Sequence, residues 1–159
     1  NHGPQPRFDN DQTFRTIRSV FLPHSSMTAN ARHDITTPDH VRLLVDSFYA
    51  KIRVDPLLGG IFNGVIQDRW PQHLAKMYTF WGTILIGEQS YMGAPFRPHK
   101  DLPVDQAHFD RWLLLFRDTV NDLFEGPAAD LALTNAERMA DMFMERITFF
   151  RAHPQRHIQ

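Results

Sequence analysis

Two histidines have the residue type and the sequence setting of metal ligands. His99 lies in YMGAPFRPHKDLP, a segment whose three prolines exclude a continuous helix, and His73 lies 26 residues earlier on an apolar helical pattern. A metal-bound imidazole needs a fixed ring direction and an acceptor for its second N–H. A proline-stiffened segment with free backbone carbonyls supplies both. The spacing therefore suggests two imidazoles that face opposite sides of a flat cofactor.

Tyr49, His73 and Trp112 are expected to point inward from three different helices. A buried phenol, imidazole or indole needs a hydrogen-bond partner, and the indole can only donate. Three polar groups in one small core would be satisfied by one shared acceptor, such as a bound ligand. Taken singly, each residue has a simpler interpretation. A histidine on an apolar face is more often a satisfied core residue than a ligand, and a loop histidine is more often exposed.

The elements that must position these residues are predicted to be helices. From Thr37 onward apolar residues recur at helical spacing, and no long stretch alternates as a strand would. Thr37-Pro38-Asp39 is typical of a helix start. Three more long helices are expected from Trp70, from about 103–105 and from Pro127, with a short glycine-limited element in DPLLGGIFNG. The expected inner faces are Val41, Leu44, Val45, Phe48, Tyr49 and Ile52; then His73, Met77, Phe80, Trp81, Ile84 and Leu85; then Phe109, Trp112, Leu113, Phe116, Val120 and Leu123; and finally Leu131, Met139, Ala140, Phe143, Ile147 and Phe150.

Composition narrows the class of protein. The chain has 159 residues, 42% of them apolar, which suits one compact core. A formal net charge of -1 without long charged runs argues against nucleic acid as a partner, and the short apolar runs argue against membrane insertion. The absence of cysteine excludes disulfides, thiolate metal sites and a cysteine nucleophile. No phosphate-binding loop, GxSxG or HExxH motif supports a common catalytic route.

The ends of the sequence are expected to lie outside the folded domain. We expect a flexible extension over 1–36, a helical domain over 37–152 and a flexible tail over 153–159. Residues 1–26 are interpreted as a vector-derived leader or an over-extended start, with a native disordered arm as the alternative. No signal-peptide pattern is present in the sequence, which predicts a cytoplasmic location.

Three stretches together resemble the truncated haemoglobins, most of all their third group. They are VDSFYAKIRVDPLLGGIFN, WPQHLAKMYTFWGTILIGEQSYMGAPFRPH and HFDRWLLLF, and the resemblance covers roughly Asp39 to Phe150. It implies an all-α protein with the truncated globin 2-over-2 α-helical sandwich around a haem. The implied cofactor is haem b, that is, protoporphyrin IX iron.

The resemblance also implies roles for individual residues. His99 matches the proximal ligand to iron, and His73 is a candidate sixth ligand. Tyr49, His73 and Trp112 match the polar distal residues. Phe62 matches a phenylalanine that packs on the face of the haem. Met77 and Trp81 match positions that line the distal pocket and the edge of the cofactor. Lys76 is a candidate partner of a haem propionate, as are Arg97 and Lys100, which flank His99.

The implied function is reversible binding of dioxygen and of other diatomic gases such as carbon monoxide and nitric oxide. Hydrogen bonds from Tyr49 and Trp112 to partly negative dioxygen, at about 1.5–3 kcal/mol each, predict slow oxygen release. The alternative is a haem enzyme that oxidises nitric oxide or activates peroxide or oxygen, with an unidentified reductase as partner. A third interpretation is a haem-free bundle whose buried Tyr, His and Trp bond one another.

Overall fold

The structure is a computed structural model that describes residues 31–154, so the predictions made for 1–26 and for the last five residues lie outside the described residues. Within 31–154 the chain forms five α-helices and one short 3-10 turn. In order they are α1 (Pro38–Val54), α2 (Gly59–Ile66), α3 (Trp70–Ile86), the turn η1 (Arg97–His99), α4 (Gln106–Leu123) and α5 (Pro127–Ala152).

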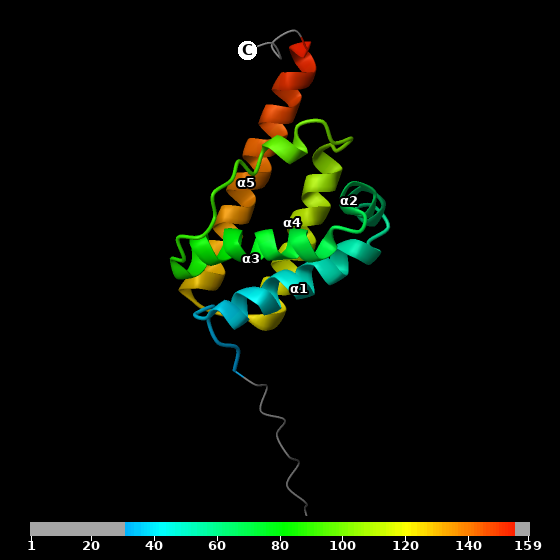
Figure 1. Cartoon of the computed structure of the whole chain (residues 1–159). Helices are drawn as coiled ribbons and strands as arrows, with labels where there is room; N and C mark the ends of the chain where they lie inside the picture. The colour runs from blue at the N-terminus through cyan, green and yellow to red at the C-terminus, as the bar shows by residue number, and fades with distance from the viewer. Residues whose placement is uncertain (1–30, 155–159) are drawn as a thin grey trace, which may run out of the picture. The chain divides into compact units, whose positions relative to one another are not determined.

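The four long helices form two layers. α1 packs against α3, α4 packs against α5, and the layers meet where α1 contacts α4 and α3 contacts α5, as Figure 1 shows. The short helix α2 packs against α1. This arrangement confirms the predicted 2-over-2 α-helical sandwich. None of the helices in the described range is both long and apolar enough to cross a membrane.

Local sequence explains where the first layer begins and which face it buries. The Thr37 side chain accepts a hydrogen bond from the His40 backbone N–H, and Pro38 occupies the first turn, where its missing N–H costs nothing. α3 begins with Trp70-Pro71 and ends at Gly87, whose φ of 73° is readily adopted by glycine. The buried residues of α1 are the six predicted ones: Val41, Leu44, Val45, Phe48, Tyr49 and Ile52.

The connection between α3 and α4 is irregular, as its prolines predict, but it contains the turn η1. The turn was not predicted, because one 3-10 turn gives no periodic pattern. α4 then begins at a capping box, in which the Asp105 side chain accepts from the His108 backbone N–H and the His108 side chain accepts from the Asp105 backbone N–H.

One prediction for α5 is wrong. Leu131 was expected on the inner face, but it is 42% exposed. The buried stripe of the first half of α5 consists of small residues instead, namely Ala129, Ala132, Ala136 and Ala140, and larger side chains, Phe143 and Ile147, are buried further on. Small side chains allow close approach of neighbouring helices, so burial there follows alanine rather than the most apolar residue.

Asp34 connects the segment before α1 to the start of α5. Its carboxylate accepts hydrogen bonds from the backbone N–H groups of Ala128 and Ala129 at 3.0 and 2.9 Å. Burial alone would raise the pKa of Asp34, but these amides and that of Ile35 outweigh it and lower the pKa. Gly126 allows this contact, since its φ is 137° and a Cβ atom there would lie 2.7 Å from the Asp34 carboxyl carbon.

Candidate haem site

His99 ends the turn η1 with its ring direction fixed. Its Nδ1 lies 2.7 Å from the Pro95 carbonyl oxygen, and its ring centroid lies 4.7 Å from that of Phe143. Because a carbonyl only accepts, Nδ1 carries the proton and the lone pair is on Nε2. Burial lowers the pKa of His99, and the Pro95 hydrogen bond opposes this only in part. The residue is therefore a neutral imidazole whose Nε2 can bind a metal.

Tyr49 and His73 meet in the interior from α1 and α3. Their ring centroids are 5.0 Å apart with an interplanar angle of 89°. Trp70, at the start of α3, packs on both rings, at 5.9 Å from Tyr49 and 5.7 Å from His73. Phe62 of α2 lies 6.2 Å from Tyr49. The structure thus brings together three of the predicted residues from three helices.

His73 carries an unsatisfied polar atom. Its Nε2 is buried and has no hydrogen-bond partner within residues 31–154. Burial, together with the charges of Lys76 and His99, lowers the pKa of His73 to about 4. His73 is therefore neutral at neutral pH, and the two histidines lie close enough to interact electrostatically. Buried polar atoms without a partner are rare in native proteins, so Nε2 is suited to a group absent from the protein itself.

Phe48 links Tyr49 to Trp112. Its ring centroid lies 5.0 Å from Tyr49 and 5.3 Å from Trp112, which is half-buried on α4. Trp112 stacks on Phe116 with an interplanar angle of 1°, and Phe116 stacks on Trp81 of α3 at 4.9 Å. Burial raises the pKa of Tyr49, so its hydroxyl stays protonated and remains a donor. The phenol and the indole thus provide two donors beside one aromatic cluster.

Asp55 holds α2 to α4 beneath these rings. Its Oδ1 accepts from the backbone N–H groups of Leu57 and Leu58, both at 3.0 Å, and its Oδ2 accepts from Arg111 Nε at 2.7 Å. Because Arg111 directly precedes Trp112, this ion pair fixes the start of α2, and thus Phe62, relative to the distal face of α4.

The remaining predicted residues differ in how far they are exposed to solvent. Met77 is half-buried and packs against the core, whereas Lys76 and Arg97 are exposed. Sequence reasoning did not assign a site role to Phe48, Trp70, Phe143 or the Asp55–Arg111 pair. Phe48 and Phe143 were predicted as inner-face residues and Trp70 as a helix start, but the long-range contact between Asp55 and Arg111 gives no local signal.

The side chains fit a haem. One neutral imidazole has its lone pair on Nε2 and a second has an unsatisfied Nε2, while a phenol packs against the second and an indole lies, as that phenol does, against the Phe48 ring. Within residues 31–154 no group of three or more His, Asp or Glu side chains could hold a bare metal ion. An iron already held by a porphyrin needs only an axial imidazole from the protein, and His99 is the candidate for it.

Comparison with known proteins agrees with this fold. A family described as bacterial-like globin matches residues 33–148. The group 3 truncated hemoglobin ctb of Campylobacter jejuni is 34% identical over 119 residues, which cover 72% of this chain and 94% of that protein. The crystal structure of group III truncated hemoglobin from Campylobacter jejuni matches with a TM-score of 0.67 and 32% identity, covering 73% and 94% of the two chains. The chain therefore belongs to the bacterial-like globin family and resembles its group III truncated haemoglobins.

Proposed function

We propose that the protein binds haem b and uses it to hold dioxygen and other diatomic gases, with slow oxygen release. Membership of the globin family implies haem binding and suggests a gaseous ligand. The observation that carries the proposal is the buried, unpartnered Nε2 of His73, next to Tyr49 and within electrostatic reach of His99. A haem-free bundle would have to leave this atom unsatisfied.

The chain's own residues have distinct proposed roles around the cofactor. His99 is the proximal ligand, oriented by the Pro95 carbonyl and by the Phe143 ring. Phe62, Met77 and Trp81 provide apolar contact. Lys76 and Arg97, whose side chains are exposed, are candidate partners for the propionates.

Haem supplies an iron with one axial position open to a small ligand. Tyr49 and Trp112 would donate hydrogen bonds to a ligand there that carries partial negative charge, and such bonds contribute about 1.5–3 kcal/mol each. Two of them slow dissociation by two orders of magnitude or more, since about 1.4 kcal/mol corresponds to a tenfold change. Neutral His73 can accept, donate or bind the iron when no gas is present. Carbon monoxide and nitric oxide are further proposed ligands, and the proposed location is the cytoplasm.

The test is the absorption spectrum of the purified protein in its ferric, ferrous and carbon-monoxide forms. We expect an intense Soret band that shifts on adding carbon monoxide. His99→Gly should lose haem or bind it only when imidazole is added, because the protein's axial link to iron is gone. His153→Gly is the matched control, because His153 is an exposed histidine at the end of α5.

Two outcomes would contradict the proposal. Wild-type protein that cannot be reconstituted with haem would leave the buried His, Tyr and Trp as packing residues. A His99→Gly protein with unchanged axial ligation, in the absence of imidazole, would show that another residue holds the iron.

A further inference from the structure

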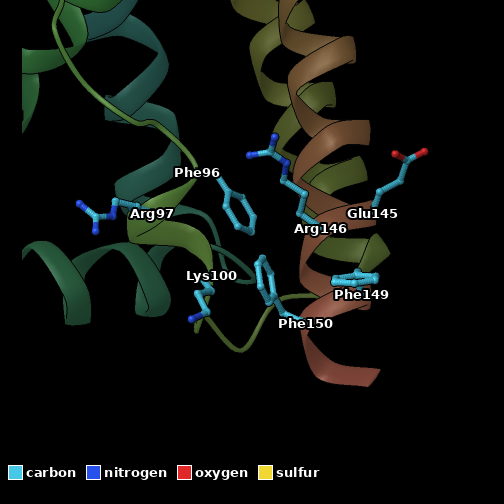
Figure 2. A pocket seen from close by; sticks show the side chains of 7 residues that line it. All are labelled: Phe96, Arg97, Lys100, Glu145, Arg146, Phe149 and Phe150. Carbon is cyan, nitrogen blue, oxygen red and sulfur yellow. The ribbon is translucent and has the colours of Figure 1, made fainter. Parts of the chain in front are cut away.

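A cleft lies between the segment around η1 and the last turns of α5. Its volume is about 610 Å³, and Figure 2 shows the side chains that surround it. They are Phe96, Arg97, Lys100, Glu145, Arg146, Phe149 and Phe150. Neither Tyr49, His73 and Trp112 nor His99 itself line this cleft, whereas Arg97 and Lys100, the candidate propionate partners on either side of His99, do.

Aromatic rings form the walls of this cleft. Phe96 and Phe150 stack with centroids 5.9 Å apart and an interplanar angle of 19°. Phe149 meets Phe150 edge-on at 5.8 Å, and 42% of its surface is exposed. Flat aromatic groups bind by stacking on surfaces of this kind.

Positive charge surrounds the rings. Lys100 Nζ lies 5.1 Å from the Phe150 centroid, and the Arg146 guanidinium carbon lies 5.3 Å from the Phe96 centroid. Neither Lys100, Arg146 nor Arg97 takes part in the ion pairs found within residues 31–154. Figure 2 shows the Glu145 carboxylate and the Arg97 guanidinium both directed away from Phe96 and Phe150, so Lys100 and Arg146 are the cations that lie over the rings. The cleft therefore complements an anionic group attached to a flat ring.

The wall of the cleft is in ring contact with the proximal side of the candidate haem site. The Phe96 centroid lies 5.6 Å from that of Phe143, and Phe143 lies 4.7 Å from His99. Phe143 is buried, so no solvent separates these rings. The cleft wall at Phe96 thus lies two ring contacts from the proposed iron ligand, and a molecule stacked on Phe96 would lie three contacts from it.

We propose that the cleft binds a planar aromatic anion of the flavin nucleotide class, and that the reduced flavin delivers electrons to the haem from the proximal side. The proposed electron delivery rests on the proposed function, since dioxygen and carbon monoxide bind only to ferrous iron. The reaction balances: one reduced flavin gives two electrons to two ferric haems in succession, yields two ferrous haems and the oxidised flavin, and releases two protons.

Binding is tested first, on the haem-loaded protein with oxidised flavin mononucleotide, by isothermal titration calorimetry. Riboflavin carries the same ring without the phosphate, and inorganic phosphate carries the anion without the ring. We expect the nucleotide to bind at least about fivefold more tightly than either, because both the stacking surface and the cations contribute. Equal affinity for riboflavin and the nucleotide would overturn the role of the cations, and absence of nucleotide binding would overturn the proposal.

Two variants locate the site. Phe149→Ala removes an exposed ring and Arg146→Gln removes a cation, and each should weaken nucleotide binding by about fivefold or more. Arg138→Gln is the matched control, because this exposed arginine lies on the same helix about 12 Å from Arg146 and outside the cleft. The carbon-monoxide spectrum of all three should match that of the wild type. Unchanged affinity in both cleft variants would place the nucleotide elsewhere.

Electron delivery is tested by mixing ferric protein with photoreduced flavin mononucleotide under carbon monoxide, which reports each ferrous haem formed. Wild-type and Arg138→Gln proteins should be reduced several times faster than Arg146→Gln, while dithionite should reduce all three at one rate. Equal rates with the flavin would overturn delivery through the cleft. If dithionite and carbon monoxide produce no haem spectrum, the proposed function fails and electron delivery with it, whereas the same calorimetry on the protein as purified still decides whether the cleft binds the nucleotide.

Discussion

Tyr49 and Trp112 are the two residues whose donors distinguish this interior from a plain apolar core. They come from α1 and α4, and the Phe48 ring lies against both. The tyrosine is buried and its hydroxyl stays protonated, whereas the indole N–H can only donate. Their value to a bound gas therefore depends on the negative charge that the gas carries.

This charge dependence gives a prediction for Tyr49→Phe and Trp112→Phe. Each should raise the oxygen dissociation rate about tenfold or more, because each removes a hydrogen bond to a charged acceptor. The carbon monoxide dissociation rate should change less, since that ligand carries less negative charge. Stopped-flow measurement of both gases checks this. Equal changes for the two gases would indicate a steric gate.

The buried Nε2 of His73 lowers the stability of the haem-free fold but serves the proposed binding of haem and gas. This Nε2 is buried and finds no partner in the part of the chain that the structure describes, and such an unsatisfied atom costs about 1–3 kcal/mol of folding free energy. We expect His73→Leu to leave the haem-free protein as stable as the wild type, or about 1 kcal/mol more stable, while the oxygen dissociation rate changes. Urea unfolding of the two apo-proteins measures the difference. A large loss of stability in His73→Leu would show that His73 is a satisfied packing residue.

At the scale of elements, the junction of α1, α2 and α4 depends on Asp55. Its side chain is 2% exposed and satisfies two amides at the start of α2 as well as Arg111 on α4. Burial alone would raise the pKa of Asp55, but the Arg111 hydrogen bond and the amides of Leu58 and Leu57 lower it below 3.8. A carboxyl with a lowered folded pKa stabilises the fold above the unfolded pKa, and this contribution is lost as the pH falls through the folded pKa.

Asp55→Asn should therefore lower the free energy of unfolding by about 1–3 kcal/mol at about pH 7. The difference from the wild type should shrink as the pH falls below 3.8 and through the lowered pKa of Asp55, because the wild-type carboxyl then becomes protonated and loses its charge. Urea unfolding at about pH 7 and at a series of acidic pH values measures this. Asp122→Asn is the control, since Asp122 is 68% exposed in its pair with Lys51 and should cost little. A pH-independent difference would show that the charge of Asp55 does not matter.

The same elements show what could be predicted from sequence. The six buried residues of α1 follow from helical periodicity, because one face of a regular helix repeats locally. The exposure of Leu131 does not follow from periodicity, because the helices packed against α5 determine which of its faces is buried. The face that they cover carries a stripe of alanines instead. The Asp55–Arg111 pair spans 56 residues and leaves no periodic trace. Tyr49, His73 and Trp112 were assigned by residue type and resemblance, whereas their ring contacts required the fold.

At the scale of the whole molecule, the least regular part of the domain carries the proposed iron ligand. Between Gly87 and Asp105 the backbone forms only the turn η1, and Met92 is 98% exposed. Arg151 at the end of α5 donates to the carbonyls of Leu102 and Val104 and fastens only the last part of this connection. A bond from His99 to the haem iron would hold the middle of this connection in place.

Haem removal should therefore loosen this connection before it unfolds the helices. A ligand present at about 1,000 times its dissociation constant stabilises the native state by about 4 kcal/mol, which corresponds to a rise in melting temperature of about 10 °C for a chain of this size. We expect limited proteolysis to cut the apo-protein between residues 87 and 105 while the haem-loaded protein resists, because local opening of a segment with few backbone hydrogen bonds precedes global unfolding. Peptide mass mapping locates the cuts. His99→Gly mixed with haem should be cut like the apo-protein, since its connection lacks the iron bond. Equal cleavage of haem-loaded wild-type and apo-protein would mean that the helices, and not the cofactor, hold this connection in place.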